Sequence, residues 1–110
     1  MGMDYQLDRA WANAAKGIRQ CQKADKAWQK GNTDSAGDHF GKALEKFEIA
    51  VEHLAKAAED ADIKAGKLLS EGNQQLQKAI DQFANDDADG AKKHYEKALD
   101  KYDEALDLIV

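Results

Sequence analysis

The sequence predicts an all-α protein, an antiparallel up-down-up-down four-helix bundle made from a duplicated helical hairpin. Three observations support this fold class. The 110 residues contain no proline and are rich in alanine, leucine, lysine and glutamate, which are good helix formers. Apolar residues recur at steps of three and four, as on one face of a helix. The chain also aligns with itself at an offset of half its length.

The duplication relates residues 1–55 to residues 56–110 without a gap, and 14 of the 55 pairs are identical. It is clearest in two runs, HFGKALEKF from His39 and HYEKALDKY from His94. We therefore expect residues 1–110 to form a single domain of two similar hairpins, each with two helices of roughly 25 residues.

The first hairpin begins with an amphipathic seam in which large residues alternate with small ones: Met3, Leu7, Ala10, Ala14, Gly17, Cys21, Ala24 and Trp28. A turn at residues 31–32 follows, with Asn32 or Thr33 as the expected N-cap. The second seam has the same alternation: Ala36, Phe40, Ala43, Phe47, Ala50, Leu54, Ala57 and Ala61.

The second hairpin repeats both seams. Its first helix carries Ala65, Leu69, Gly72, Leu76, Ala79 and Phe83. Its second helix carries Ala91, Tyr95, Ala98, Tyr102, Ala105 and Ile109. Small residues let helix backbones approach closely while aromatic rings fill the space opposite. We therefore expect the equivalent residues Phe47 and Tyr102 to be buried against glycines of neighbouring helices, with the Tyr102 hydroxyl near the rim.

The link between the hairpins has two interpretations. In the preferred one, a monomer, Asp60, Ala61 and Asp62 form a tight turn between two helices. However, residues 43–64 contain neither Gly nor Pro, and the seam continues through this region. The alternative is one long central helix over about residues 33–84, which would force two chains to pair as a swapped dimer.

The charge distribution excludes several classes of partner. The net charge of −5 comes entirely from residues 56–110, which hold eight basic and 13 acidic residues, whereas residues 1–55 hold eight of each. No basic stripe is interleaved with aromatic residues, so we expect neither nucleic acid nor membrane as a partner. The N-terminus lacks the basic and apolar segments of a secretory signal, so we expect a cytoplasmic protein, although an exported mature form stays open.

Two stretches resemble the second helix of a tetratricopeptide repeat: residues 31–47 and residues 87–102. The shared features are a small residue at Ala36 or Ala91, an aromatic at Phe40 or Tyr95, and the Lys-Ala-Leu that follows. The period here is 55 residues, against about 34 in that family. The resemblance implies similar packing on longer hairpins and a role in protein binding, without that family's superhelical groove.

A second resemblance is to small metal-binding helical-bundle proteins, which duplicate a hairpin around a Gly-x-Thr-Asp turn followed by a helical histidine. Here Gly31, Thr33 and Asp34 precede His39, and His94 occupies the matching place. The resemblance implies a Cu, Ni or Zn site. Because the second and fourth helices of such a bundle run parallel, His39 and His94 would lie at the same end, with Asp38 as a carboxylate ligand. The simpler interpretation is that each histidine flanks the core and was copied with the hairpin.

Two further motifs each have two interpretations. Asn85, Asp87, Asp89 and Gly90 with Glu96 match the spacing of a calcium-binding EF-hand loop, but the repeat places this segment at the start of a helix, which acidic residues also favour. Trp11 lies one step off its seam, with Ile18 a heptad further on and Gly66 as its repeat partner. This flank is either a patch for a partner or, as preferred, a wider core stripe.

No reaction constellation emerges from the sequence. There is no Glu-x-x-His, no Cys-x-x-Cys-His and no glycine-rich phosphate loop, and Cys21 lies on a core seam. We therefore predict no enzymatic activity, no catalytic residues and no cofactor. The leading hypothesis is a soluble, acidic, non-enzymatic module that binds a protein partner. The alternatives are the small metal-binding protein described above and an enzyme-like pocket between helices, for which no residues are nominated.

Overall fold

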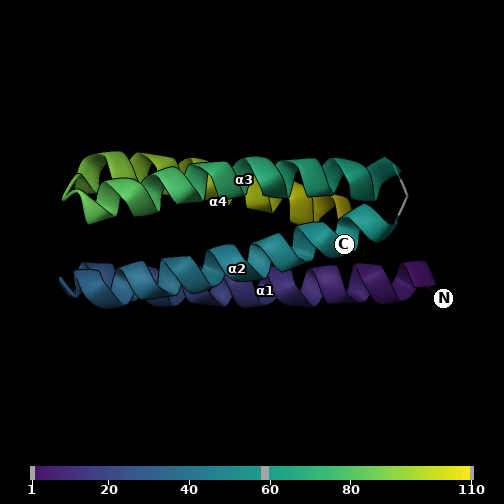
Figure 1. Cartoon of the computed structure of the whole chain (residues 1–110), viewed down its shortest axis with the longest axis horizontal. Helices are drawn as coiled ribbons and strands as arrows, with labels where there is room; N and C mark the ends of the chain where they lie inside the picture. The colour runs from purple at the N-terminus through teal and green to yellow at the C-terminus, as the bar shows by residue number, and fades with distance from the viewer. Residues whose placement is uncertain (1, 58–59, 110) are drawn as a thin grey trace.

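The computed structural model of the chain describes residues 2–57 and 60–109. These residues form four helices: α1 (Gly2–Gln29), α2 (Thr33–Ala57), α3 (Asp60–Ala84) and α4 (Ala88–Ile109). No strand occurs in these residues. The bundle is elongated, with extents of 45 × 18 × 17 Å, because the long helices run side by side (Figure 1). The predicted all-α four-helix bundle of two hairpins is confirmed.

The two hairpins form two layers. α1 packs along α2 in one layer and α3 packs along α4 in the other, and α2 also packs against α3 (Figure 1). The chain folds back between α2 and α3, so the two are separate helices and not one continuous helix over residues 33–84. The single chain therefore builds the four-helix arrangement by itself.

The connection between the hairpins differs from the expected turn. Asp60, Ala61 and Asp62 are helical and begin α3, so the connection falls on residues 58–59, outside the described residues. The shift has a physical reason. Alanine has the highest helix propensity, and acidic residues are favoured in the first turn by the helix dipole. These preferences place the three residues inside the helix and not before it.

The turns inside the two hairpins are equivalent. Gly31 has a φ of 78° and its repeat partner Asp86 has a φ of 60°, both in the left-handed region that ends a helix. In each turn the next residue caps the following helix. The Asn32 Oδ1 accepts a hydrogen bond from the Ser35 N–H (3.2 Å), and the Asp87 Oδ1 accepts one from the Gly90 N–H (3.0 Å). Asn32 is therefore the N-cap of α2.

The centre of the core follows the predicted seams. Phe47 and Tyr102 are completely buried and their rings stack, with centroids 3.6 Å apart and an interplanar angle of 15°. Each ring lies against a glycine of its own hairpin. A Cβ atom added at Gly17 would lie 2.8 Å from the Phe47 ring, and one at Gly72 would lie 2.6 Å from the Tyr102 ring. The close approach of these helices therefore depends on the two glycines.

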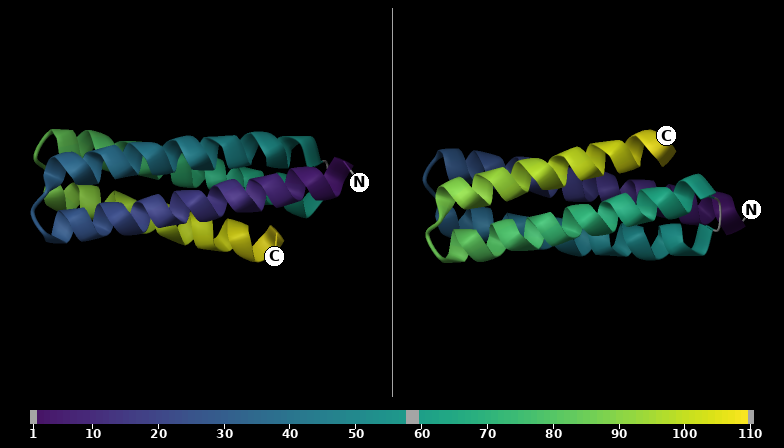
Figure 2. Two further views of the ribbon diagram at one scale, coloured as in Figure 1. Left: turned by 90° about the horizontal axis from the view of Figure 1, so that it is seen from below. Right: turned by 90° about the horizontal axis from the view of Figure 1, so that it is seen from above.

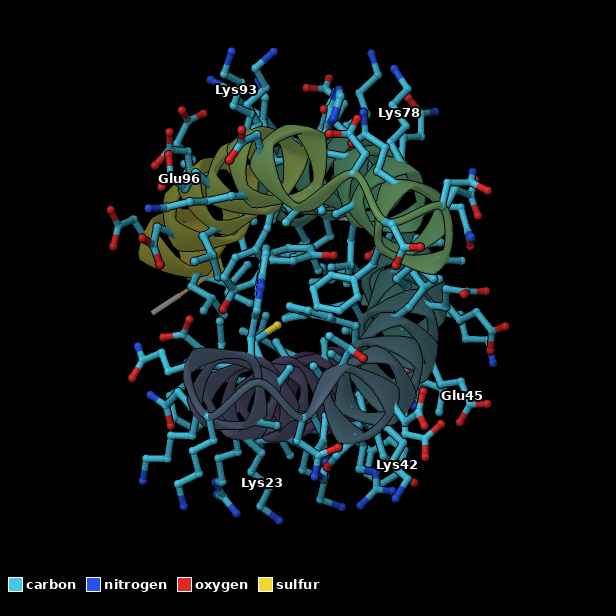
Figure 3. The ribbon with its side chains drawn as sticks, turned by 90° about the vertical axis from the view of Figure 1, so that its left-hand side faces the viewer. Lys23, Lys42, Glu45, Lys78, Lys93 and Glu96 are labelled. Carbon is cyan, nitrogen blue, oxygen red and sulfur yellow. The ribbon has the colours of Figure 1, made fainter. Side chains whose placement is uncertain are left out.

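A second aromatic layer lies near the turns of the hairpins. Trp28 and Phe83, which are equivalent in the repeat, have ring centroids 4.5 Å apart, and the equivalent pair Phe40 and Tyr95 have centroids 4.9 Å apart. Both pairs meet edge to face. Figure 3 shows the bundle from this end, with labelled charged side chains such as Lys23 directed away from the interior. The core is therefore continuous along the bundle and the charges surround it.

Candidate functional site

The three histidines each contact the other helix of their own hairpin. The Nδ1 of His39 lies 2.7 Å from the Oε1 of Gln20, so the ring N–H donates to the amide oxygen. His53 makes the same contact with Gln6 at 2.6 Å. His94 makes it with Gln82 at 2.6 Å. Each histidine therefore forms a hydrogen bond between the two helices of its own hairpin.

The two histidines of the predicted metal site have separate hydrogen-bond partners in the structure. His39 on α2 is bonded to α1, and His94 on α4 is bonded to α3, while Asp38 is exposed on α2. Within residues 2–57 and 60–109, no three His, Cys, Asp or Glu side chains are grouped so that they could hold a metal ion. No contact joins His39, His94 and Asp38 in these residues, and a metal site there stays a prediction.

The glutamine that binds the histidine differs between the two repeats. Gln75 is the repeat equivalent of Gln20 and would be expected to bind His94. Instead His94 bonds to Gln82, one turn from the hairpin loop, and also approaches the carbonyl oxygen of Gly90 at 3.1 Å. As a result the Oε1 of Gln75 is buried without a hydrogen-bond partner. The duplication therefore preserves the histidine but not its partner.

The lone cysteine lies in the core, as predicted. Cys21 is 1% exposed, and burial raises the pKa of its thiol to about 12. Its backbone carbonyl accepts a hydrogen bond from the Tyr95 hydroxyl at 3.4 Å. Burial also raises the pKa values of the Tyr95 and Tyr102 hydroxyls above their ordinary value. These groups stay protonated near neutral pH, which is the state expected of packing residues and not of nucleophiles.

The acidic segment that matches the EF-hand spacing forms the start of a helix. Asp87 caps α4, which begins at Ala88. Ala91 and Tyr95 are buried on its core face, as the repeat predicts. Because Glu96 lies more than two turns into this helix, the segment does not wrap around a common centre in the manner of a calcium loop.

The two seams between the hairpins are unlike each other. α2 packs along α3, whereas α1 and α4 touch at only a few points. Figure 2 shows α4 crossing α1 at an angle, so that the C-terminal end of α4 swings away from the other three helices. The two seams differ in two respects: α2 and α3 follow each other directly in the chain whereas α1 and α4 are the first and last helices, and the repeats diverge at several seam positions.

Three divergent positions lie on the α1 flank that faces α4. Trp11, Ile18 and Asp25 are one heptad apart and share this flank, while the opposite flank of α1 carries the glutamines that bind α2. Their repeat equivalents on α3 are Gly66, Asn73 and Ile80. A Cβ atom added at Gly66 would lie in ordinary contact with the Leu54 side chain, at 3.6 Å, so α2 packs directly beside that glycine. At the equivalent place α1 carries the much larger Trp11, whose side chain is 48% exposed.

The flank of Trp11 was interpreted from the sequence as a wider core stripe. The structure places Trp11 48% exposed and Ile18 only half-buried, so this stripe is not covered. We call the gap between α1 and α4 the open seam. Six apolar residues lie on its two flanks by their helical register: Leu7, Trp11, Ile18 and Trp28 of α1, and Leu99 and Leu106 of α4.

The open seam deepens into a cleft near the hairpin turns. The cleft measures about 630 Å³ and is lined by Trp28, Tyr95, Leu99, Asp25, Lys92 and Glu96. Its floor is therefore apolar and aromatic, and its walls carry more acidic than basic groups. Sequence analysis did not find this cleft. The unequal repeat pairs were the only available sign of it.

A row of carboxylates borders the open seam on α4. Glu96, Asp100, Asp103 and Asp107 follow each other at steps of four, three and four and are all exposed. We call this row the acidic stripe. Lys101 lies on the other flank of α4, where its Nζ is 3.1 Å from a carboxylate oxygen of Glu71 on α3. Glu96 of the stripe lines the cleft, Asp100 and Asp107 lie on the outer face of α4, and Lys101 is directed toward α3.

Comparison with known proteins finds no matching family model, no similar curated protein and no similar solved structure. No helix in the described ranges has a stretch long and apolar enough to cross a membrane. The site is therefore judged on its own geometry.

Proposed function

We propose that the protein is a non-enzymatic interaction module that binds a protein partner along the open seam. One observation carries this proposal. α2 packs along α3 beside Gly66, whereas α1 and α4 touch at only a few points, and Trp11, the repeat equivalent of Gly66, stays 48% exposed on the α1 flank that faces α4. Tryptophan is enriched at protein interfaces and among the residues that contribute most to binding.

The remainder of the bundle gives the binding surface a rigid support. The helices on both sides of the open seam are anchored in the core through buried residues such as Cys21 and Tyr102. The apolar residues of the seam also pack against this core from the outer side. A partner can therefore bind without reorganising the hairpins, which lowers the entropic cost of association.

A matched cross-linking experiment tests the proposal. A photoreactive amino acid is placed at Ile18 in the open seam and, in a second variant, at the exposed Lys42 on the outer side of α2. We expect a discrete protein adduct at position 18 in cells of the source organism and none at position 42. The partner found is then purified, and its binding to the recombinant chain should be lost in Trp11→Ala. Equal adducts at both positions, or binding that Trp11→Ala leaves unchanged, would contradict the proposal.

A further inference from the structure

We propose that the partner enters the open seam as a basic amphipathic helix, with an arginine or lysine of that helix in the cleft beside Trp28. This inference rests on the function proposed above and adds the chemistry of the partner. It follows from three features of the seam: its apolar floor, the composition of its cleft and the charge of its border.

The floor of the seam has the periodicity of a helix-binding groove. Trp11 and Ile18 are one heptad apart on α1, and Leu99 and Leu106 are one heptad apart on α4. Two such rows, carried by neighbouring helices, present a groove into which apolar side chains at i, i+3, i+4 and i+7 of a third helix fit. An added helix would therefore extend the packing of the bundle with the same spacing.

The cleft suits a cationic side chain at one end of that helix. It combines the ring of Trp28 and the ring of Tyr95 with the carboxylates of Asp25 and Glu96. A guanidinium or ammonium group is attracted both to the face of an aromatic ring and to carboxylates. Among the described residues, one basic side chain, Lys92, lines the cleft, together with the carboxylates of Asp25, Asp89 and Glu96.

The acidic stripe favours a basic partner, whose long side chains would reach past the edge of the seam to the outer face of α4. Glu96 and Asp107 are 11 positions apart, which corresponds to about 16 Å or three helical turns. A partner with lysine or arginine residues on one edge over the same length would pair with the stripe. Opposite charges would also steer its approach and select its orientation.

The same charges argue against a second copy of this chain as the occupant. The chain carries a net charge of −5. Two copies docked seam to seam would bring two acidic stripes together, and like charges facing each other are unfavourable. A partner of opposite charge does not meet this repulsion.

Synthetic peptides test the inference directly. One peptide of about 18 residues carries leucines at i, i+3, i+4 and i+7 with arginine and lysine beside them, and lacks tryptophan. The second peptide has glutamate at every basic position. Trp28 lines the cleft and Trp11 is exposed on the α1 flank that faces α4, so the tryptophan fluorescence reports occupation. We expect saturable binding of the basic peptide, weakened by salt, and no binding of the acidic peptide.

Repeat-equivalent variants provide the matched control. Asp103→Lys with Asp107→Lys reverses half of the acidic stripe, and Glu48→Lys with Glu52→Lys makes the same change at the equivalent positions of α2. We expect the first pair to weaken binding of the basic peptide by at least about tenfold and the second to have little effect. Circular dichroism confirms that both variants are folded.

Each result has a defined consequence. The inference is overturned if the basic peptide fails to bind, if the acidic peptide binds equally well, or if both double variants weaken binding alike. Failure of the inference is distinguishable from failure of the proposed function. A partner that cross-links at Ile18 and depends on Trp11, but is not a basic helix, leaves the proposed function standing.

Discussion

The ring of Phe47 stacks on the ring of Tyr102 at the centre of the bundle, and the two residues are equivalent in the sequence repeat. Their side chains come from α2 and α4, one from each hairpin. The contact therefore joins the two hairpins across the core. The Tyr102 hydroxyl donates a hydrogen bond to the Asn73 Oδ1 at 2.7 Å. Tyr102 is therefore fully buried and satisfied, and not placed with its hydroxyl at the rim as the sequence suggested.

Phe47→Ala should lower the free energy of unfolding by about 3–5 kcal/mol, because it removes a buried aromatic ring and leaves a cavity beside Gly17. Tyr102→Phe keeps the ring and removes one hydrogen bond, so it should cost only about 1 kcal/mol. Urea denaturation measures both, with the exposed Lys42→Ala as control. A Phe47→Ala variant as stable as the native protein would mean that the stack does not exist.

Asp86→Gly should stabilise the protein by about 0.5–1 kcal/mol, because Asp86 has a positive φ that glycine adopts more readily. The reverse change at the equivalent turn, Gly31→Asp, should destabilise it by a similar amount. No atom lies within 4 Å of a Cβ added at Gly31, so only the backbone conformation is tested there. Thermal melting of the pair gives the answer, and a shift in the same direction for both variants would contradict the explanation.

The Cys21 thiol should react slowly with thiol reagents in the folded protein at pH 8, and rapidly in urea, because burial raises its pKa to about 12. The raised pKa also makes stability depend on pH. In the unfolded chain the thiol ionises near its ordinary pKa of about 8.5, so the folded state holds the proton more tightly.

The contribution of Cys21 to stability is therefore complete below about pH 8.5 and is lost as the pH rises toward the folded pKa of about 12. Urea unfolding between neutral and alkaline pH measures the loss, which should be smaller in Cys21→Ala. Part of the pH dependence of stability should remain in Cys21→Ala, because the pKa values of the Tyr95 and Tyr102 hydroxyls are also raised in the folded state. Rapid labelling of the native thiol would disprove the burial of Cys21.

Titration calorimetry with Cu, Ni and Zn should show no saturable binding in the micromolar range. His39 and His94 are each bonded to a glutamine of their own hairpin, and no third ligand is grouped with them in the described ranges. His39→Ala and His94→Ala are the controls. Micromolar binding that disappears in both variants would instead support the small metal-binding protein.

The fold was predictable from the sequence because its determinants are local and repeated. The alternation of large and small residues identifies the core face, so the burial of Phe40, Phe47 and Tyr95 followed from their spacing. The turn at Gly31 and the cap at Asn32 followed from residue type. The start of α3 was misplaced by a few residues, because Ala57 and Ala61 on either side of the connection favour helix equally.

The site was harder to predict because it depends on the distance between two helices. Trp11 has the same periodicity whether it is buried by α4 or exposed beside it. Whether Trp11 is covered depends on how closely α4 approaches α1, and the residues of the repeat do not specify that distance. The histidine contacts were equally hard to predict. His94 bonds to Gln82 and not to Gln75, a choice that depends on side-chain geometry and cannot be read from the repeat.

The unequal seams also determine where the bundle has contacts to lose. The α2–α3 contact and the stack of Phe47 on Tyr102 join the two hairpins, whereas α1 and α4 share few contacts. A helix added between α1 and α4 would therefore displace little existing packing, and the core that joins the hairpins would stay intact.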